Sequence, residues 1–388
     1  MSARLPRGVI ALGFVSLAMD LSSEMIHSLL PVFLVTVLGA SAMSVGVIEG
    51  VAEAAVSVAK IFSGMISDWV GRRKPLVLFG YGLSALTKPL FPLATGIGTV
   101  LAARFLDRVG KGIRGAPRDA LIADITPGPL RGAAYGLRQA MDTAGAFAGP
   151  LVAMVVMVMT HNDFHRVFWI AVIPAAVCVF LIMVGVDEPR LTRPQPLGRV
   201  LLSRADLARL PARYWQVVIL AFMLTLARFS EAFLLLRAEN VGVSLAWTPI
   251  VLIVMNAVYA VFAYPLGKLS DSWSRRGLLL LGISALIVAD IVLATASDAW
   301  VVVIGAGLWG LHMSATEGLI AALIAETAPT SLRGTAFGLF HLVSGVALLL
   351  ASTIAGGLWT LLGPAATFSA GAVFAAIAAI GLASRRLR

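Results

Sequence analysis

Charged residues, histidines and cysteines are all scarce in this sequence. Asp, Glu, Lys and Arg make up only 13% of the 388 residues, and the five histidines are scattered without the spacing of a zinc or haem site. The single cysteine, Cys178, excludes a disulfide within one chain. We therefore expect neither a metal site nor a cofactor.

The motifs of several enzyme classes are missing as well. The sequence contains no HExxH, no GxSxG and no glycine-rich phosphate-binding loop. No segment has the character of a nucleotide-binding domain, which an ATP-driven pump requires. The sequence thus argues against an enzyme and against an ATP-driven pump.

Hydrophobic residues are abundant instead. They form 59% of the chain, and the mean hydropathy is +0.93. Apolar runs of about 20 residues, each long enough to cross a bilayer, recur from end to end. These runs predict an all-α membrane protein with many spans. The start, MSARLPRG, resembles the basic part of a signal peptide, but the apolar stretch after it is too long, so we expect a retained first span.

The apolar runs divide into twelve predicted transmembrane helices. The first six cover residues 8–37, 43–68, 75–95, 98–124, 132–159 and 165–186, and the last six cover 215–238, 245–270, 277–296, 299–326, 334–360 and 364–384. The loop between the two sets is rich in Arg and Pro, with a short amphipathic helix expected around Val200–Leu210. The predicted domains are an N-terminal six-helix half (1–186), a cytoplasmic linker (187–213) and a C-terminal six-helix half (214–388).

Lys and Arg are distributed unequally over the predicted loops. If the N-terminus is cytoplasmic, the inner loops and both termini hold most of them, and Arg166 is the clear exception outside. Because cytoplasmic loops carry an excess of Lys and Arg, we expect both termini to face the cytoplasm, with the protein in the inner (cytoplasmic) membrane. The same bias explains the net charge of +10 better than nucleic-acid binding does.

Two segments of the first half recur in the second. GMISDWVGRR (64–73) matches GKLSDSWSRR (267–276), an offset of 203 residues, and ALIADITPGPLRGAAYGL (120–137) matches ALIAETAPTSLRGTAFGL (322–339), an offset of 202. Two nearly equal offsets indicate two halves with parallel topology. Such halves, with a site between them near the middle of the membrane, are what a rocking transporter needs.

The first repeat resembles a loop motif of the major facilitator superfamily. GMISDWVGRRK has a Gly, an Asp four residues later and then Gly-Arg-Arg-Lys, and it falls between spans 2 and 3. The second copy has Ser274 in place of the second glycine. The resemblance covers the whole chain and implies a secondary transporter that works by alternating access.

Residues at the predicted cytoplasmic ends of the spans form a candidate gate. Gly64 allows close helix approach and Gly71 a tight turn, and Asp124 is expected to pair with Arg72 or Arg131. Such clusters can hold the inner face shut and release it as the halves move, or they only anchor short loops near the headgroups. The full set is Gly64, Asp68, Gly71, Arg72, Arg73, Asp124 and Arg131, with Asp271, Arg275, Glu326 and Arg333 in the second half.

A second resemblance lies in span 5. GAFAGP, with Gly145, Gly149 and Pro150, is similar to the core of a motif that accompanies export and antiport in this superfamily, although Leu151 and Val152 stand where glycines usually follow. The resemblance implies an exporter. Small residues four apart also serve ordinary helix packing, which is the alternative.

The most highly charged segment lies inside a predicted span. RFLDRVGKGIRGAPRD (104–119) holds five cations and two acids. Each such residue costs about 2.5–3.5 kcal/mol at the centre of a lipid-facing helix, so seven would cost on the order of 20 kcal/mol, more than a typical total stability. At about 100° per residue they share about 140° of the helix circumference. This face is therefore predicted to meet protein or water.

The same span resembles the superfamily pattern of an Arg followed by a polar residue and a glycine, at Arg108, Lys111 and Gly112. Lys111 replaces the usual polar residue and Arg114 a small one, so the face is unusually cationic. We expect it to bind an anionic or zwitterionic substrate. The candidate substrate-binding residues are Arg104, Arg108, Lys111, Arg114, Arg118, His27, Arg138, Lys88, Arg228 and Glu231.

Acidic residues in neighbouring spans are the candidate partners of these cations. Glu24 with Asp20 is the preferred site for a coupling proton, followed by Glu49 and Glu53, and Asp142 completes the set. Moving Arg108 toward or away from such a carboxylate would change its proton binding. In the alternative interpretation, the acids only neutralise span 4 in a fixed buried network.

Together these features predict a proton-coupled exporter of a small organic solute that is anionic or amphiphilic. Its expected partners are that solute, protons and the lipid bilayer, without nucleic acid, and we expect a monomer. The alternatives are a lipid or lysolipid flippase on the same fold, an importer of an organic anion, or a site for neutral or cationic drugs. Five aromatic residues either line a pocket for an amphiphile or only pack: Trp247, Tyr259, Tyr264, Trp309 and Phe340.

Overall fold

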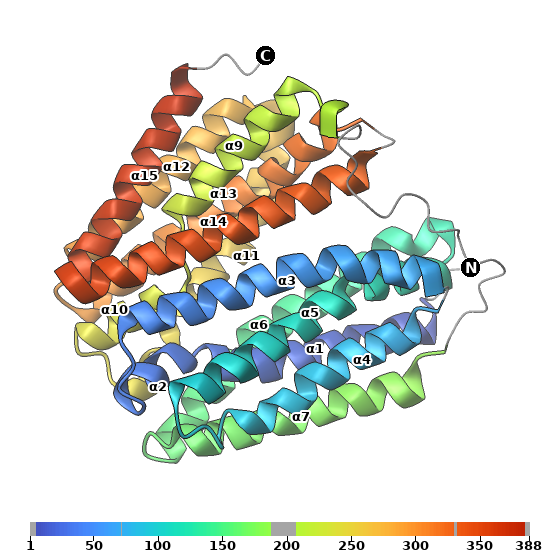
Figure 1. Cartoon of the computed structure of the whole chain (residues 1–388), viewed down its shortest axis with the longest axis horizontal. Coiled ribbons are helices and arrows are strands. Elements are labelled where there is room, and N and C mark those ends of the chain that lie inside the picture. The colour runs from blue at the N-terminus through green and yellow to red at the C-terminus, as the bar shows by residue number, and fades with distance from the viewer. Residues whose placement is uncertain (1–4, 71, 188–206, 330–331, 385–388) are drawn as a thin grey trace. The chain divides into compact units, whose positions relative to one another are not determined.

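The computed structural model describes residues 5–70, 72–187, 207–329 and 332–384, and within these ranges it leaves the side chains of 65, 68, 69, 129, 270–272, 333–335 and 384 undescribed. The described residues form helices and no strand (Figure 1). In chain order these are α1 (Arg7–His27), α2 (Leu30–Thr36), α3 (Ala42–Val70), α4 (Lys74–Thr87), η1 (Lys88–Leu90), α5 (Ile97–Ile125), η2 (Gly128–Leu130), α6 (Arg131–Met159), α7 (Phe164–Gly185), α9 (Ala212–Ala227), α10 (Ala232–Asn240), η3 (Leu245–Trp247), α11 (Ile250–Ser272), α12 (Arg275–Ala294), α13 (Ala299–Thr327), α14 (Arg333–Leu362) and α15 (Pro364–Ser384).

The twelve predicted spans are all recognisable in these helices. Nine stretches of the described chain are helical, long and apolar enough to cross a membrane. The other three predicted spans correspond to α3, to α4 with η1, and to α5. Of these, α4 has only 14 residues before η1 begins, while α3 and α5 carry several charged side chains. The architecture agrees with the predicted all-α class.

The chain divides into two compact units. Unit 1 consists of Met1–Phe33 and Ala55–Val200, and unit 2 consists of Leu34–Ala54 and Leu201–Arg388. Unit 2 therefore includes α2 from Leu34 onward and the first part of α3, which the predicted domain limits assign to the N-terminal half. Those limits stay a prediction, and the amphipathic helix expected around Val200–Leu210 lies largely outside the described residues.

Unit 1 is built around the packing of α1 on α6 and α7 and of α4 on α5. Leu12, Val77, Leu121 and Cys178 are fully buried in one apolar cluster. In unit 2, α12 packs against both α13 and α15, and α11 packs against α13. A second apolar cluster there includes Tyr214, whose hydroxyl donates to the Ala336 carbonyl at 2.9 Å.

Two predicted spans are interrupted rather than continuous. The first divides into α1 and α2 at Ser28 and Leu29, shortly before Pro31, which has no N–H to continue the hydrogen bonds of α1. The seventh divides into α9 and α10 between Arg228 and Glu231. No proline accounts for this second break. There the backbone N–H of Ser230 donates to the Ser352 hydroxyl of α14 instead of to a helical carbonyl.

The third predicted span also ends earlier than expected. Regular α-helix stops at Thr87, and a single 3-10 turn continues it to Leu90. Pro89 and Pro92 follow within five residues, and neither can donate the backbone hydrogen bond that an α-helix requires. Lys88, one of the candidate substrate-binding residues, lies at this irregular end.

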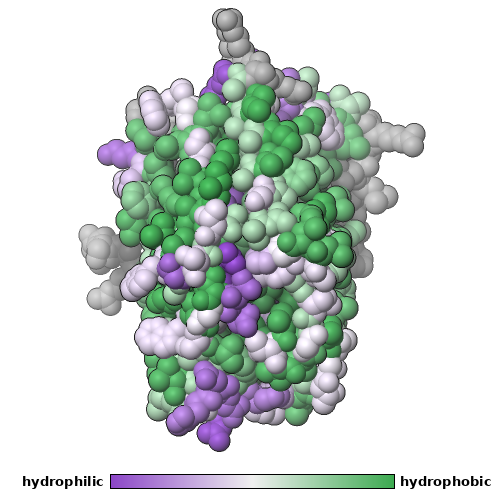
Figure 2. Space-filling view, turned by 90° about the vertical axis from the view of Figure 1, so that its left-hand side faces the viewer, coloured by the Kyte–Doolittle hydropathy of each residue, from purple (hydrophilic) through white to green (hydrophobic). Residues whose placement is uncertain are grey.

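Many apolar side chains lie on the surface. Ile173 and Phe180 of α7 are 62% and 57% exposed, whereas Cys178 of the same helix is fully buried. Figure 2 shows one face of the molecule on which hydrophobic residues predominate and hydrophilic ones gather in patches. Exposed apolar surface of this extent suits contact with lipid rather than water.

Arg237 closes the C-terminal end of α12. Its guanidinium donates to the carbonyls of Leu293 at 2.9 Å and Ala296 at 2.6 Å, and to the Asn240 side chain at 2.5 Å. These carbonyls lie at or beyond the last turn of α12, where helical N–H donors run out; the Leu293 carbonyl also accepts from the Ala296 N–H, at 3.4 Å. A buried cation thus satisfies several acceptors at once.

We expect Arg237→Met to lower the unfolding free energy by about 1–3 kcal/mol, because the substitution removes the guanidinium donors of these buried carbonyls. Thermal unfolding of the purified protein in detergent measures the change. Arg213→Met, which removes an exposed cation, is the matched control and should unfold like the wild type. Equal melting of the two variants would show that the Arg237 bonds contribute nothing measurable.

Candidate functional site

The charged face of α5 is buried, as its sequence predicts. Arg104, Asp107, Arg108 and Arg114 are each between 1% and 4% exposed. Lys111, on the same face, is exposed, and Arg118 and Asp119 are half-buried. The cations on this face of α5 therefore include both buried arginines and one exposed lysine.

Lys88 and Asp107 form a deeply buried ion pair in unit 1. The Lys88 Nζ lies 3.0 Å from Asp107 Oδ1 and also donates to the Ser23 hydroxyl at 2.9 Å. Their side chains are only 1% and 5% exposed. Lys88 was predicted to bind substrate, and acids on other spans were predicted to neutralise the cations of α5. In the structure, Lys88 instead pairs with Asp107, an acid of α5 itself.

Arg114 is held by a hydroxyl group and an aromatic ring. Its Nη1 donates to the Ser84 hydroxyl at 2.6 Å, and its guanidinium stacks over the Tyr81 ring at 4.5 Å from the centroid. Both partners come from α4. Ser84 and Tyr81 were not among the predicted site residues. The sequence pattern that could have identified them is their helical spacing from Lys88, which places all three on one face of the third predicted span.

Two arginines and two acids form a network between α5 and α6. Arg138 Nη1 lies 3.1 Å from Asp142 and 3.5 Å from Asp119, and Arg118 reaches Asp119 at 3.2 Å and Asp142 at 3.8 Å. Arg118 also donates to the Ser16 hydroxyl of α1 at 3.0 Å. This part of the set matches the prediction that acids of span 5 meet cations of span 4.

Glu24 and Asp20 lie on α1 beside the same cations. Glu24 Oε2 is 3.2 Å from His27 Nδ1, and Lys111 and Arg108 are near enough to attract its carboxylate. Lys111 also acts on Asp20. The preferred proton-site acids are thus adjacent to the accessible cation of α5.

Glycines of α6 bring α1 close at these two acids. A Cβ placed on Gly145 would lie 2.7 Å from the Leu17 carbonyl oxygen and 3.0 Å from the Asp20 Cβ, and one on Gly149 would lie 2.6 Å from the Glu24 Cβ. In the same way, Gly112 allows α5 to approach Ala59 of α3. The packing role that was the alternative for GAFAGP has a direct structural basis, and its link to export stays a prediction.

Gly149→Ala is expected to reduce transport strongly while leaving the protein membrane-inserted, since its methyl group would displace Glu24 and the backbone of Leu21. Uptake into proteoliposomes, with the folded fraction determined by gel filtration in detergent, measures the effect. Gly136→Ala on the same helix is the matched control, because a Cβ there meets nothing within 4 Å. Equal transport by both variants would argue against a need for this close approach.

The gate residues are only partly described. Arg73, rather than Arg72 or Arg131, donates to Asp124 at 3.3 Å, and it also donates to the Ser67 hydroxyl at 2.7 Å; the pairing expected for Asp124 is therefore corrected. In the second half Arg275 pairs with Glu326. Gly64 lies near Ala116 of α5, in agreement with close helix approach. Gly71 and the side chains of Asp68, Asp271 and Arg333 lie outside the described residues.

Unit 2 has polar contacts of its own. Arg228 Nη1 lies 2.6 Å from Glu317 Oε1 at the break between α9 and α10, and His312 bonds to the Gly282 carbonyl at 2.9 Å. Glu317 was absent from the predicted site set. Glu49 is buried, and both it and Glu53 lie in the stretch of α3 that belongs to unit 2.

The candidate pocket aromatics differ in how far their side chains are buried. Trp309 is fully buried and packs edge-on against Phe229, with ring centroids 5.5 Å apart. Trp247 and Tyr264 are 51% and 78% exposed. At Trp309, the packing interpretation holds.

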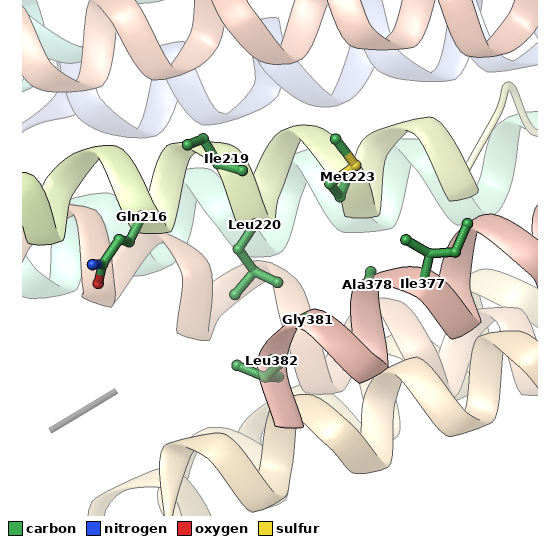
Figure 3. Close-up of a pocket in the computed structure, with 8 residues that line it drawn as sticks. All are labelled: Gln216, Ile219, Leu220, Met223, Ile377, Ala378, Gly381 and Leu382. Carbon is green, nitrogen blue, oxygen red and sulfur yellow. The ribbon is translucent and has the colours of Figure 1, made fainter. Parts of the chain in front are cut away.

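A groove of about 160 Å³ opens between α9 and α15 (Figure 3). Gln216 contributes its one amide, and the remaining lining residues are apolar or glycine: Ile219, Leu220, Met223, Ile377, Ala378, Gly381 and Leu382. Both helices are candidate membrane spans. Such a groove suits a hydrocarbon chain.

Comparison with known proteins decides the family. The model of the Major Facilitator Superfamily matches residues 12–255 and 219–388. This chain belongs to the major facilitator superfamily. An uncharacterised transporter of this type from Methanocaldococcus jannaschii is 33% identical over 383 residues, covering 97% of this chain and 94% of the relative. Membership confirms the predicted family and the all-α fold with twelve spans, and it establishes a multi-pass membrane transporter.

Two further members of the superfamily bear on the fold and on function. The crystal structure of a point mutant of the nucleoside transporter NupG superposes with a TM-score of 0.82 at 13% identity, covering 97% of this chain and 99% of that one. This likeness shows the fold alone. The multidrug resistance protein MdtH of Edwardsiella ictaluri is 31% identical over 144 residues, which is 37% of this chain and 35% of that protein.

Proposed function

We propose that this transporter is a proton-coupled antiporter that exports a small organic anion. The observation that carries the proposal is the charge balance of the polar cluster in unit 1. Seven cations and five acids lie on α1, α5, α6 and η1, the turn that follows α4. The cations are Lys88, Arg104, Arg108, Lys111, Arg114, Arg118 and Arg138, and the acids are Asp20, Glu24, Asp107, Asp119 and Asp142. A net positive site inside a membrane protein favours an anion.

Substrate contact is assigned to Arg114 and Lys111. Arg114 is held by a hydroxyl group and an aromatic ring, and Lys111 is accessible. A carboxylate or phosphate would add the charged partner that neither Ser84 nor Tyr81 supplies to Arg114. Lys88, by contrast, is already bound to Asp107 and is assigned a structural role.

Proton coupling is assigned to Glu24 and Asp20. Both lie on α1 beside Lys111, so an anion bound at Lys111 would compete with these carboxylates for the same positive charge. Substrate binding would then favour protonated acids, and substrate release would favour ionised ones. This linkage couples the anion to a proton. Because the two are then bound and released together, it does not by itself give exchange, and antiport is proposed on the two likenesses that follow.

Export rather than import is supported by two likenesses. GAFAGP is similar to the motif that accompanies antiport, and a relative that matches over 144 residues is named a multidrug resistance protein. The Arg73–Asp124 and Arg275–Glu326 pairs are proposed as inner latches of this cycle. We further propose a monomer in the inner membrane with both termini in the cytoplasm.

The test is transport by the purified protein in liposomes under an imposed pH gradient. A panel of labelled aromatic carboxylates and organic phosphates serves as the probe, with a quaternary ammonium dye as the cationic control. Accumulation of an anion that requires the gradient and reverses with its direction is expected. Transport of the cationic dye alone would contradict the anion assignment, and movement of anion and proton in the same direction would indicate an importer.

A lipid flippase is the second candidate function, and the groove between α9 and α15 favours it (Figure 3). The groove could hold an acyl chain while a cationic residue binds the lipid phosphate. Scrambling of a fluorescent phospholipid in the same liposomes, without anion uptake, would support this candidate over antiport.

A further inference from the structure

A lone carboxyl group lies in the interior of unit 2. Asp290 of α12 is fully buried, and neither of its side-chain oxygens has a hydrogen-bond partner among the described residues. In unit 1 the buried acid Asp107 is paired with Lys88 at 3.0 Å. Asp290 has no equivalent cation, although both acids lie in predicted membrane spans.

The surroundings of Asp290 are tight and apolar. A Cβ added to Gly371 of α15 would lie 2.6 Å from Asp290 Oδ2 and 3.1 Å from the ring of Phe229. Only a glycine therefore fits opposite the carboxyl group. The described residues contain no group of three or more His, Cys, Asp or Glu that could hold a metal cation.

One hydrogen-bond donor lies at the same level of the unit. The Nε1 of Trp309 on α13 is buried and has no acceptor among the described residues. α12 and α13 run antiparallel, with Gly282 against Ala315 and Gly305 against Leu293, so Asp290 and Trp309 occupy similar heights between these contacts. Phe229, whose ring packs on Trp309, borders Gly371 together with Asp290.

The ionisable groups on the adjoining elements are engaged elsewhere. His312 of α13 bonds to the Gly282 carbonyl, and Arg237 of α10 to carbonyls beyond Asp290. At the α9–α10 break, Arg228 pairs with Glu317, which also interacts with Tyr259 of α11. Between Pro364 and Leu382, α15 has no ionisable side chain. An ionised Asp290 would thus be an unpaired buried charge.

We propose that the Asp290 carboxyl group is a proton-binding site, occupied whenever α15 packs on α12 as seen here. An unpaired charge in such surroundings is so unfavourable that the group takes up a proton instead. Release of the proton to water leaves a carboxylate that needs a donor. The Trp309 indole N–H is that donor, and bringing the two groups together repacks α12, α13 and α15 around Phe229.

This proposal adds a second proton site to the antiport proposed above, yet it does not depend on transport. Infrared spectroscopy of the protein in liposomes reads the acid directly, through the C=O stretching band of a protonated carboxyl group. Antiport can fail in the transport assay while this band remains, and the band can be absent while antiport persists. The two proposals are therefore tested separately.

At neutral pH, the wild type is expected to show the C=O band of protonated carboxyl groups. One component of this band should be lost in Asp290→Asn. The same component should be retained in Glu239→Gln, the control variant, which removes an acid at the end of α10. Raising the pH should remove the same component from the wild type. An Asp290→Asn spectrum that keeps the whole band would overturn the proposal.

Two further variants cover other outcomes. If Asp290→Asn does not fold, Gly371→Ala should shift the frequency of this component, because its methyl group presses on Oδ2, and an unshifted band would again contradict the site. Trp309→Phe should raise the pH at which the component disappears, since the ionised form loses its donor. An unchanged pH dependence would overturn the assignment of Trp309.

Discussion

Asp107→Leu is expected to lower the unfolding free energy by about 3–5 kcal/mol, because it leaves the Lys88 ammonium group as an uncompensated buried charge. The two side chains are only 1% and 5% exposed, so water cannot replace the lost partner. The Ser23 hydroxyl, which accepts from Lys88 at 2.9 Å, satisfies one of its protons but neutralises no charge. Thermal unfolding in detergent measures the loss.

Combining Asp107→Leu with Lys88→Met should restore most of the lost stability. Burying an ion pair costs desolvation free energy that its attraction barely repays, so apolar replacements of both partners are often neutral. The double variant also keeps the net charge of the cluster unchanged. If the two losses simply add, the pair is not the unit that this geometry describes.

The double variant further decides the role of Lys88. If Lys88 only holds Asp107, a folded double variant should transport the anion nearly as well as the wild type. If it folds but does not transport, Lys88 contacts the substrate, as its place in the sequence first suggested. Glu239→Gln, outside the cluster, controls for reconstitution.

Glu24→Gln is expected to abolish transport driven by a pH gradient while leaving the fold intact. Gln has nearly the same shape, so its Cβ still fits against Gly149 and its side chain can still bond to His27. It cannot take up or release a proton. Gradient-driven uptake should fall to the level of liposomes without protein, and binding of the anion, measured by thermal shift, should persist.

Full proton-coupled activity of Glu24→Gln would remove Glu24 from the mechanism. The same assay on Asp20→Asn would then identify the next candidate, before Glu49 and Glu53. Loss of the folded peak in gel filtration, rather than loss of transport alone, would assign Glu24 to structure instead of coupling. Glu239→Gln again provides the matched acid-to-amide change.

Helical periodicity predicted which residues of α5 share a face, but not which partners they meet. The spacing of Arg104, Asp107 and Arg108 already places them on one side of a helix, and the structure buries all three. That Asp107 binds Lys88 could not be foreseen. It depends on the prolines that end α4 early and on Gly80 and Gly110, whose missing side chains let α4 and α5 approach closely.

The break of the seventh span shows the same limit. Nothing in LTLARFSEAFLLL interrupts a helical pattern as Pro31 does in the first span. The chain leaves the helix there because Ser352 of α14 offers the Ser230 N–H another acceptor and Arg228 reaches Glu317 of α13. Partners more than 80 residues away cannot be read from local propensity.

The sequence by itself determined the class of this protein, its spans and its charged helix, because hydropathy and residue spacing act within a single helix. Its repeats and motifs already pointed to the superfamily. Only the tertiary structure decided the partners: Arg73 for Asp124, Lys88 for Asp107, and for Asp290 no partner among the described residues. Those pairings depend on how closely the helices pack and on how each helix is rotated about its axis. Glycines and side chains from distant parts of the sequence together determine both.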